Sequence, residues 1–391
     1  MAGEQSKTTK QVELFFGPQH PGVPGNVGFK IWLEGERVVD VELIPGFLFR
    51  GFEKMMENRT WEMNIVMCYR FCVEDPDNLE IAYAEAVDKI FKAEVPEKAK
   101  YVRMIMAEFS RVASHLFWVN FMSGGVGLRT IGYWAIAARE EILKWFARVT
   151  GHRIYHSFSV PGGIRWDVPQ DFRDTTLNLA NKVEDIVEDI EEALLRNPVF
   201  KARTKNIGIL KAEDAIRLGV TGPSLRAGGM PYDIRKAVPY ENYDKVKFNV
   251  PVGENGDSYE RSVIRFKEIH ESLNIIRQSV EEVKPGAPYR VKLPLTAPAG
   301  VGVSRVESAR GEYMIHVISM GVMKAERVDD KYVVHFTGQG GRKPYRVRLR
   351  SVSLPLLTTV LKHIVKNEEV TIADFPVIVK SLDPCPPDID R

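Results

Sequence analysis

Residues 101–116 read YVRMIMAEFSRVASHL and form the most strongly patterned stretch of the chain. The apolar residues recur at spacings of three and four, which places them on one face of an α-helix. They are Val102, Ile105, Phe109, Val112 and Leu116. We therefore predict a long helix after Pro96 that packs through this face against other helices.

The same helix carries a second stripe of polar residues, Glu108, Arg111 and His115, again spaced three and four. Spacing alone favours a solvated face with ordinary ion pairing. The neighbouring Phe109 and Trp118 leave little room for solvent, however, so a buried polar network is the alternative.

Helical patterns also mark residues 134–149, 179–194 and 263–280, and the chain turns helical from about Gly51. Four or five long amphipathic helices make a bundle. Apolar alternation on both sides of Glu34-Gly35-Glu36 predicts an N-terminal β-hairpin, and strands are expected at 289–293, 313–320, 327–336 and 345–350. The predicted fold class is α+β, mainly α, with a central long-helix bundle flanked by the N-terminal β-hairpin and a C-terminal antiparallel β region.

This pattern divides the chain into four parts. We expect an N-terminal loop and hairpin at 1–50, the helical bundle at 51–285, a β-rich region at 286–350, and a C-terminal helix with a Cys-x-x-Asp tail at 351–391. With 391 residues the chain can bury a large core.

Composition indicates where the protein works. The net charge of +2 implies no nucleic-acid partner. Three cysteines are too few for a disulfide framework, and the start MAGEQSKTTK lacks the apolar core of a signal peptide, so we expect a cytoplasmic location. No apolar run approaches the roughly 20 residues that span a bilayer. Any work at a membrane is therefore expected to depend on a partner.

Two stretches near opposite ends share one pattern, Cys72-Val-Glu-Asp75 and Cys385-Pro-Pro-Asp388. A thiolate and a carboxylate three residues apart could form one edge of a metal site, and two such edges would give four ligands. An Asp oxygen in place of a second sulfur binds soft metals much less well. The pattern suggests a site whose metal has been lost, whereas each Cys taken alone could be an ordinary buried residue.

Two loops are further candidates. Gly17-Pro18-Gln19-His20-Pro21-Gly22 is rich in turn residues and presents one histidine, for which the alternative is a bond to the loop backbone. Residues 221–243 form a long irregular stretch between two predicted helices, and such a loop in a compact domain is usually functional.

From the His20 loop onward, nearly the whole chain resembles the large catalytic-type subunit shared by respiratory complex I and the membrane-bound nickel-iron hydrogenases. The matching segments follow in order. They are Tyr101 to Leu116 with its internal Glu, Arg and His, Thr221-Gly222-Pro223 to Tyr243, Arg305-Val-Glu307-Ser-Ala-Arg310-Gly311-Glu312, and the terminal Asp390-Arg391.

In the hydrogenase branch of this family, Arg-x-Cys-x-x-Cys and Asp-Pro-Cys-x-x-Cys supply four thiolates to nickel and iron. The corresponding runs here are Arg70-Phe71-Cys72-Val73-Glu74-Asp75 and Asp383-Pro384-Cys385-Pro386-Pro387-Asp388. The resemblance therefore implies no nickel-iron centre and no metal in this chain. In the complex I branch, a Tyr of the first run and the loop His hold a quinone headgroup. His20 fits, but the Tyr position falls on Val73, which argues against quinone reduction.

The chain is most similar to a third branch, the large subunit of the archaeal membrane-bound sulfane sulfur reductase. This resemblance implies a ferredoxin-dependent, ion-pumping complex on the cytoplasmic side of the membrane. Its partners would be a small subunit carrying the proximal [4Fe-4S] cluster, ferredoxin-accepting subunits and antiporter-like membrane subunits. Three cysteines cannot ligate an ordinary four-thiolate cluster, so the clusters must lie in partner subunits.

By this resemblance, polysulfide is reduced in a pocket between the two subunits, and six residues of this chain are candidates for the chemistry. Arg310 would stabilise the anion that develops on sulfur, and His20 would position substrate or deliver protons. Cys72 and Cys385 would line the pocket as thiols or form transient mixed disulfides with the substrate. Asp75 and Asp388 would pair with arginine or relay protons. The alternatives are packed remnants without chemistry, a quinone-reducing subunit, a metal-binding hydrogenase, or a structural scaffold for the partner's cluster.

Overall fold

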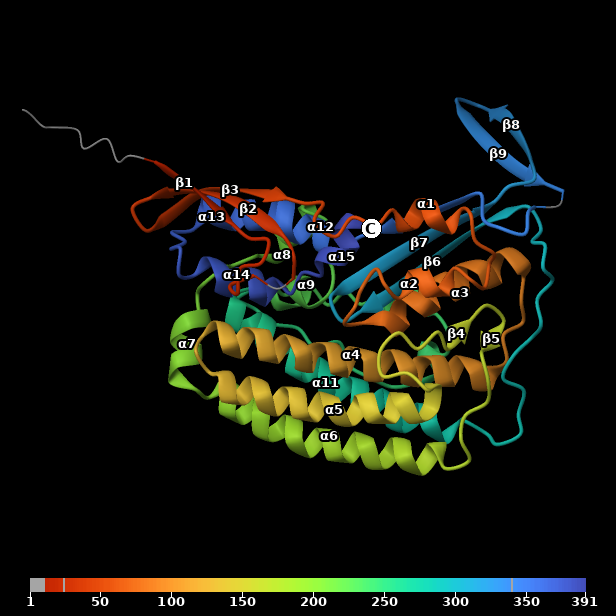
Figure 1. Ribbon diagram of the computed structural model, residues 1–391, viewed down its shortest axis with the longest axis horizontal. Helices are drawn as coiled ribbons and strands as arrows, with labels where there is room; N and C mark the ends of the chain where they lie inside the picture. The colour runs from red at the N-terminus through yellow and green to blue at the C-terminus, as the bar shows by residue number, and fades with distance from the viewer. Residues whose placement is uncertain (1–10, 24, 339) are drawn as a thin grey trace, which may run out of the picture.

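The computed structural model describes residues 11–23, 25–338 and 340–391, and the polar stretch at 1–10 lies outside them. The chain is 47% helical and 16% strand, which confirms the mainly α prediction. Figure 1 shows a layer of long helices covered on one side by small sheets and short helices. The long helices are α4 (Glu97–Gly125), α5 (Arg129–Thr150), α6 (Phe172–Leu195) and α11 (Ser258–Glu281).

Helix α4 lies at the centre of the molecule. It contacts α5 and α11 within the helical layer and α3 (Pro76–Phe91) in the covering layer. Glu108, Arg111 and His115 are each 0% exposed. The solvated-face interpretation of this stripe is therefore wrong, because α4 has neighbours on both sides.

The predicted N-terminal hairpin is present as β2 (Gly28–Glu34) and β3 (Arg37–Ile44), and β1 (Val12–Phe16) adds a third antiparallel strand. This sheet packs on the C-terminal helices α13 (Leu361–Asn367) and α14 (Phe375–Leu382). Phe29 and Phe375, for example, stack edge to face with ring centroids 5.5 Å apart. The first and last parts of the chain therefore lie side by side.

A second antiparallel sheet has the order β10 (Arg346–Arg350), β7 (Gly311–Ser319) and β6 (Gly300–Ser308). The hairpin of β8 (Val322–Val328) and β9 (Lys331–Thr337) extends away from the body in Figure 1 and turns at residues 329–330, within the stretch predicted as a strand at 327–336. The strand predicted at 289–293 is wrong. Pro288 and Pro294 lack ladder donors, and the segment makes only one isolated bridge, from Arg290 to Gly163.

Each Cys-x-x-Asp stretch lies at the start of a helix. Asp75 precedes α3, which begins at Pro76, and Cys385 precedes α15 (Pro386–Asp390). Proline suits the first helical position because its fixed φ is helical and its missing N–H has no helical partner. No described helix is long and apolar enough to cross a membrane.

The remaining elements are short connections. They are α1 (Phe52–Met56), α2 (Ile65–Cys68), β4 (Ser159–Val160), β5 (Gly163–Ile164), α7 (Pro198–Thr204), α8 (Ala212–Arg217), α9 (Pro223–Ala227), α10 (Ile234–Ala237), η1 (Tyr243–Lys245), α12 (Ser353–Pro355) and the π-helical turn η2 (Leu356–Val360).

Candidate functional site

The fold brings Cys72 and Cys385 together. Both are free thiols, and the two residues are 0% and 3% exposed. The neighbouring Cys72 thiol and burial raise the pKa of Cys385 well above its ordinary value. The pair is therefore a buried dithiol in which Cys385 holds its proton. Cys68, one helical turn before Cys72, is a buried core residue.

Arg310 contacts this dithiol. One guanidinium nitrogen donates to Cys72 Sγ at 3.4 Å and to Ser114 Oγ at 3.1 Å. The other forms ion pairs with Glu74 and with Asp383, the latter at 3.2 Å. Burial opposes the charge of Arg310, but the carboxylates of Asp383 and Glu74 raise its pKa above the ordinary value. Arg310 therefore stays charged beside the sulfur of Cys72.

The turn between β6 and β7 fixes Arg310 in place. The Arg310 N–H donates to Ser308 Oγ at 3.1 Å, and that hydroxyl donates to the Gly311 carbonyl at 2.8 Å. Gly222 lies against the same turn with φ +74°, and a Cβ there would lie 2.4 Å from the Arg310 carbonyl oxygen. Only glycine allows the two backbones to approach so closely.

The two aspartates of the pattern are held by donors of the protein. Asp75 accepts the Ala309 N–H and the Asn78 side-chain amide, each at 2.8 Å. Asp388 accepts three hydroxyls, from Tyr313, Ser351 and Ser353. Burial raises the pKa of both carboxyls.

The four-ligand arrangement suggested by the pattern is therefore not formed. Among the described residues, no group of three or more His, Cys, Asp or Glu side chains is placed to hold a metal ion. Asp75 instead holds the turn that carries Arg310, and Asp388 is enclosed by hydroxyl groups.

The structure does not place His20 with these residues. Its ring is exposed, packs on Phe16 with centroids 3.8 Å apart, and accepts the Gly22 N–H at Nδ1 over 3.0 Å. The backbone-bonding alternative therefore describes this nitrogen. The loop itself reaches the site, because Gly25 lies directly against Pro386, the residue after Cys385.

Three contacts of Arg310 were not assigned to the site from the sequence, namely Glu74, Asp383 and Ser114. The available signal was position, since Glu74 and Asp383 lie inside the two runs that match the family motif. Burial raises the pKa of Glu74 to about 7 despite its pairing with Arg310. The Glu74 side chain is 17% exposed, so it connects the buried guanidinium with the surface.

Tyr69, Tyr155 and Arg70 form an aromatic and cationic group near the dithiol, here called the cap. Tyr155 stacks on Tyr69 with centroids 4.9 Å apart, and the Arg70 guanidinium lies 5.2 Å from the Tyr155 ring centroid. Burial raises the pKa of Tyr155, and the nearby thiols of Cys385 and Cys72 add to the shift. Tyr69 belongs to the same hydrophobic cluster as the two cysteines, and Tyr155 packs against that cluster.

The loop at 221–243 contributes to a buried ionic network instead of an open site. Arg226 pairs with Glu268 at 2.7 Å and with Glu307 at 2.8 Å, and Arg235 pairs with Glu108 at 3.0 Å. The charges of the neighbouring arginines outweigh burial and lower the pKa of Glu108 to about 2. The network joins the loop to α4, α11 and β6.

Comparison with known proteins supports the family resemblance. The family model described as "Respiratory-chain NADH dehydrogenase, 49 Kd subunit" matches residues 125–295 and 322–391. A subunit of the NADH-quinone oxidoreductase of Thermosipho melanesiensis is 39% identical, with 97% of this chain and 100% of the relative covered. A subunit of the F(420)H(2) dehydrogenase of Methanosarcina mazei is 34% identical, with 99% and 100% covered.

A solved structure shares the fold. A chain of the membrane-bound sulfane sulfur reductase, described as an archaeal respiratory membrane complex, matches with a TM-score of 0.89 and 37% identity. The match covers 98% of this chain and 100% of that chain. The chain therefore belongs to the family of the 49-kDa subunit of the respiratory-chain NADH dehydrogenase.

Proposed function

We propose that this chain is the large subunit of a ferredoxin-dependent, ion-pumping membrane complex and lines the site where sulfane sulfur is reduced. Electrons would arrive from a [4Fe-4S] cluster in a small partner subunit. The observation that carries this proposal is the buried dithiol of Cys72 and Cys385 in contact with Arg310. The similarity to the sulfane sulfur reductase structure supports the assignment of the acceptor.

The dithiol can cleave a sulfur-sulfur bond by thiol exchange. Arg310 faces Cys72 and Cys385 keeps its proton, so the Cys72 thiolate makes the first attack and releases one thiolate from the polysulfide. Cys385 then gives up its proton and attacks the mixed disulfide, which releases the second sulfur fragment as a thiolate and leaves a Cys72–Cys385 disulfide. Two electrons from the partner's cluster and one proton would return Cys72 to the thiolate and Cys385 to the thiol.

Charge on sulfur changes in every step, and Arg310 lies where it can stabilise that charge. Two carboxylates offset the guanidinium when both are ionised. With the pKa of Glu74 at about 7, a protonated Glu74 leaves Arg310 with only Asp383 as a charged partner. The site is then best suited to a developing thiolate.

The small subunit would dock over the cap of Arg70 and Tyr155. Arg50 belongs to the same surface, since it donates to the Arg70 carbonyl at 2.9 Å. The adjacent Phe49 is 70% exposed, which is unusual for a large aromatic residue and typical of an interface. A cluster docked here would face the cap, whose tyrosines pack with the two cysteines in one hydrophobic cluster.

Burial of the thiols favours a second candidate. Cys72 is 0% and Cys385 3% exposed, so substrate reaches them only if the residues around them move. In this alternative, reduction takes place on the partner's cluster and the chain is a structural scaffold. A quinone-reducing role is the other alternative, because relatives carry the name NADH-quinone oxidoreductase.

The test uses the purified complex with its small subunit. Oxidation of reduced ferredoxin is measured with polysulfide, a quinone analogue and protons as acceptors, alongside metal analysis. Turnover with polysulfide that Cys72→Ala and Arg310→Ala abolish supports the proposal. Unchanged turnover in both variants indicates the scaffold, and quinone turnover or stoichiometric nickel would overturn the sulfur-reductase assignment.

A further inference from the structure

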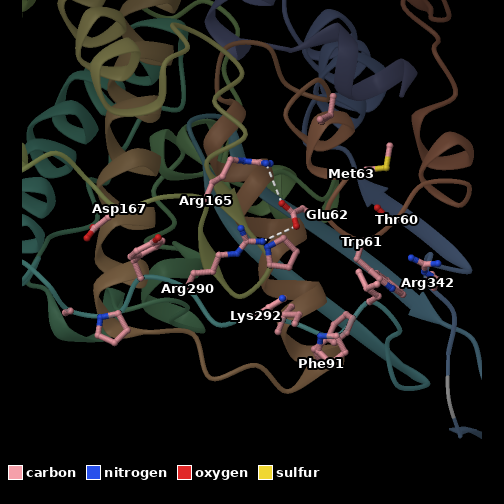
Figure 2. A pocket seen from close by; sticks show the side chains of 18 of the residues that line it. Thr60, Trp61, Glu62, Met63, Phe91, Arg165, Asp167, Arg290, Lys292 and Arg342 are labelled. Carbon is pink, nitrogen blue, oxygen red and sulfur yellow. Dashed lines mark hydrogen bonds and ion pairs between the residues drawn. The ribbon is translucent and has the colours of Figure 1, made fainter.

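A large pocket lies apart from the dithiol, between the segment before α2, the β4–β5 hairpin and the linker from α11 to β6. Its volume is about 1050 Å³. Figure 2 shows Glu62 between Arg165 and Arg290, with Arg342 beyond Trp61. None of the residues discussed above as part of the dithiol site lines this pocket.

The pocket is cationic. Four positively charged side chains line it, Arg165, Arg290, Lys292 and Arg342, against the carboxylates of Glu62 and Asp167. Both carboxylates are already engaged. Glu62 bridges Arg290 at 3.0 Å and Arg165 at 3.5 Å, and Asp167 pairs with the buried Lys98 at 2.6 Å.

Two of the cations have no ion-pair partner among the described residues. Lys292 and Arg342 are both exposed, and neither forms an ion pair with a described carboxylate. One Glu62 carboxylate also serves two arginines. The pocket therefore has an excess of positive charge that an acidic ligand would complement.

The wall of the pocket offers apolar surface and free backbone groups. Leu295 is 72% and Met63 52% exposed, and Trp61 and Phe91 also line the pocket. Residues 292–296 make no backbone hydrogen bond to any other described segment. A peptide can use the cations, the apolar surface and these backbone groups together, whereas a small anion would use only the cations.

We propose that this pocket binds an acidic peptide segment of another subunit of the same complex, with two or more carboxylates placed on Lys292 and Arg342. The inference rests on the proposed place of the chain in a multi-subunit complex, but not on the identity of the electron acceptor. Such a segment would cover Leu295 and attach the subunit to this face of the chain.

The test is site-specific photo-crosslinking in the complex purified from cells, with p-benzoylphenylalanine in place of Leu295. The expected adduct maps, by mass spectrometry, to a peptide of one known subunit that contains at least two Asp or Glu residues. Lys292→Glu with Arg342→Glu should lower the adduct yield roughly tenfold or more through like-charge repulsion. The matched control Lys366→Glu, a likewise exposed lysine on α13, should leave the yield unchanged.

A salt series on the Leu295 variant alone tests the same contact with every native charge present, and the yield should fall as the ionic strength rises. No adduct in an intact complex, an adduct to a second copy of this chain, or a small anion co-purifying in the pocket would each overturn the inference. A chain that native mass spectrometry finds alone would instead refute the proposed membership of a complex.

Discussion

Glu108 gives the sharpest test of the buried network. Its carboxylate accepts the Arg111 Nε–H at 3.1 Å, the Ser272 hydroxyl at 2.6 Å and an Arg235 N–H at 3.0 Å, and the Tyr243 hydroxyl also donates to it. Glu108→Gln removes the charge and turns an amide group toward some of these donors. We expect the variant to fold with lower stability.

The pKa shift sets the magnitude. Folding lowers the pKa of Glu108 from 4.5 to about 2, and one pKa unit corresponds to ~1.4 kcal/mol. The ionised carboxylate therefore contributes ~3 kcal/mol at pH 7. Because the folded pKa is the lower one, this contribution is complete above pH 4.5 and is lost as the pH falls toward 2.

The assay is urea unfolding of the purified protein followed by tryptophan fluorescence. Glu108→Gln should lower the free energy of unfolding by ~3 kcal/mol at pH 7, and the deficit should be about 1 kcal/mol smaller at pH 3.5. The control is Glu192→Gln, whose side chain is 63% exposed and pairs with Arg196 one turn away. Such a surface pair contributes about 0.5 kcal/mol or less. Equal losses in the two variants, or no change with pH, would refute the reasoning.

Three further predictions concern the dithiol site. Gly222→Ala should displace the turn that carries Arg310 and lower polysulfide turnover. It should also cost more stability than Gly219→Ala, because position 219 has the same φ of +74° but open space around it. Urea unfolding of Gly219→Ala should show a loss of only about 1–2 kcal/mol. Cys72→Ser should prevent the mixed disulfide, so no adduct with polysulfide appears in intact-mass spectra, whereas persistence of the adduct would contradict the assigned attack. Turnover should fall by up to about tenfold per pH unit above pH 7, because Glu74 ionises beside Arg310. Glu74→Gln should flatten this pH profile of turnover. A profile that the substitution leaves unchanged would exclude the assigned role of Glu74.

The long helices and the N-terminal hairpin could be predicted because their apolar residues follow the period of the element. Other strands broke that rule. In β1, apolar residues such as Val12 and Phe15 are exposed, by 54% and 52%. Apolar and polar residues therefore do not alternate along this strand in the way that marks one buried face. Strand β6 contains Gly302, a residue disfavoured in strands. The structure explains this glycine, since a Cβ there would lie 1.9 Å from the Ala86 carbonyl oxygen of α3.

The site was harder to predict than the fold. The pairing of the two cysteine stretches could be inferred from their shared pattern, but their partners come from distant segments that share no spacing. Ser114 lies on α4, whereas Ser351 and Ser353 follow β10. The solvated-face interpretation failed for the same reason. Spacing along one helix says nothing of which other elements cover its polar stripe.

The aspartates show why the motif keeps carboxylates although no metal cluster forms among the described residues. Asp75 accepts the N–H of Ala309, the residue before Arg310. Asp388 accepts the hydroxyl of Ser353, and that same hydroxyl oxygen accepts the N–H of Cys385 at 2.9 Å. Asp75 therefore positions Arg310 through Ala309, and Asp388 positions Cys385 through Ser353. Any buried carboxyl needs such hydrogen-bond partners, so these bonds describe Asp75 and Asp388 equally well in the proposed site and as packed, hydrogen-bonded remnants without chemistry.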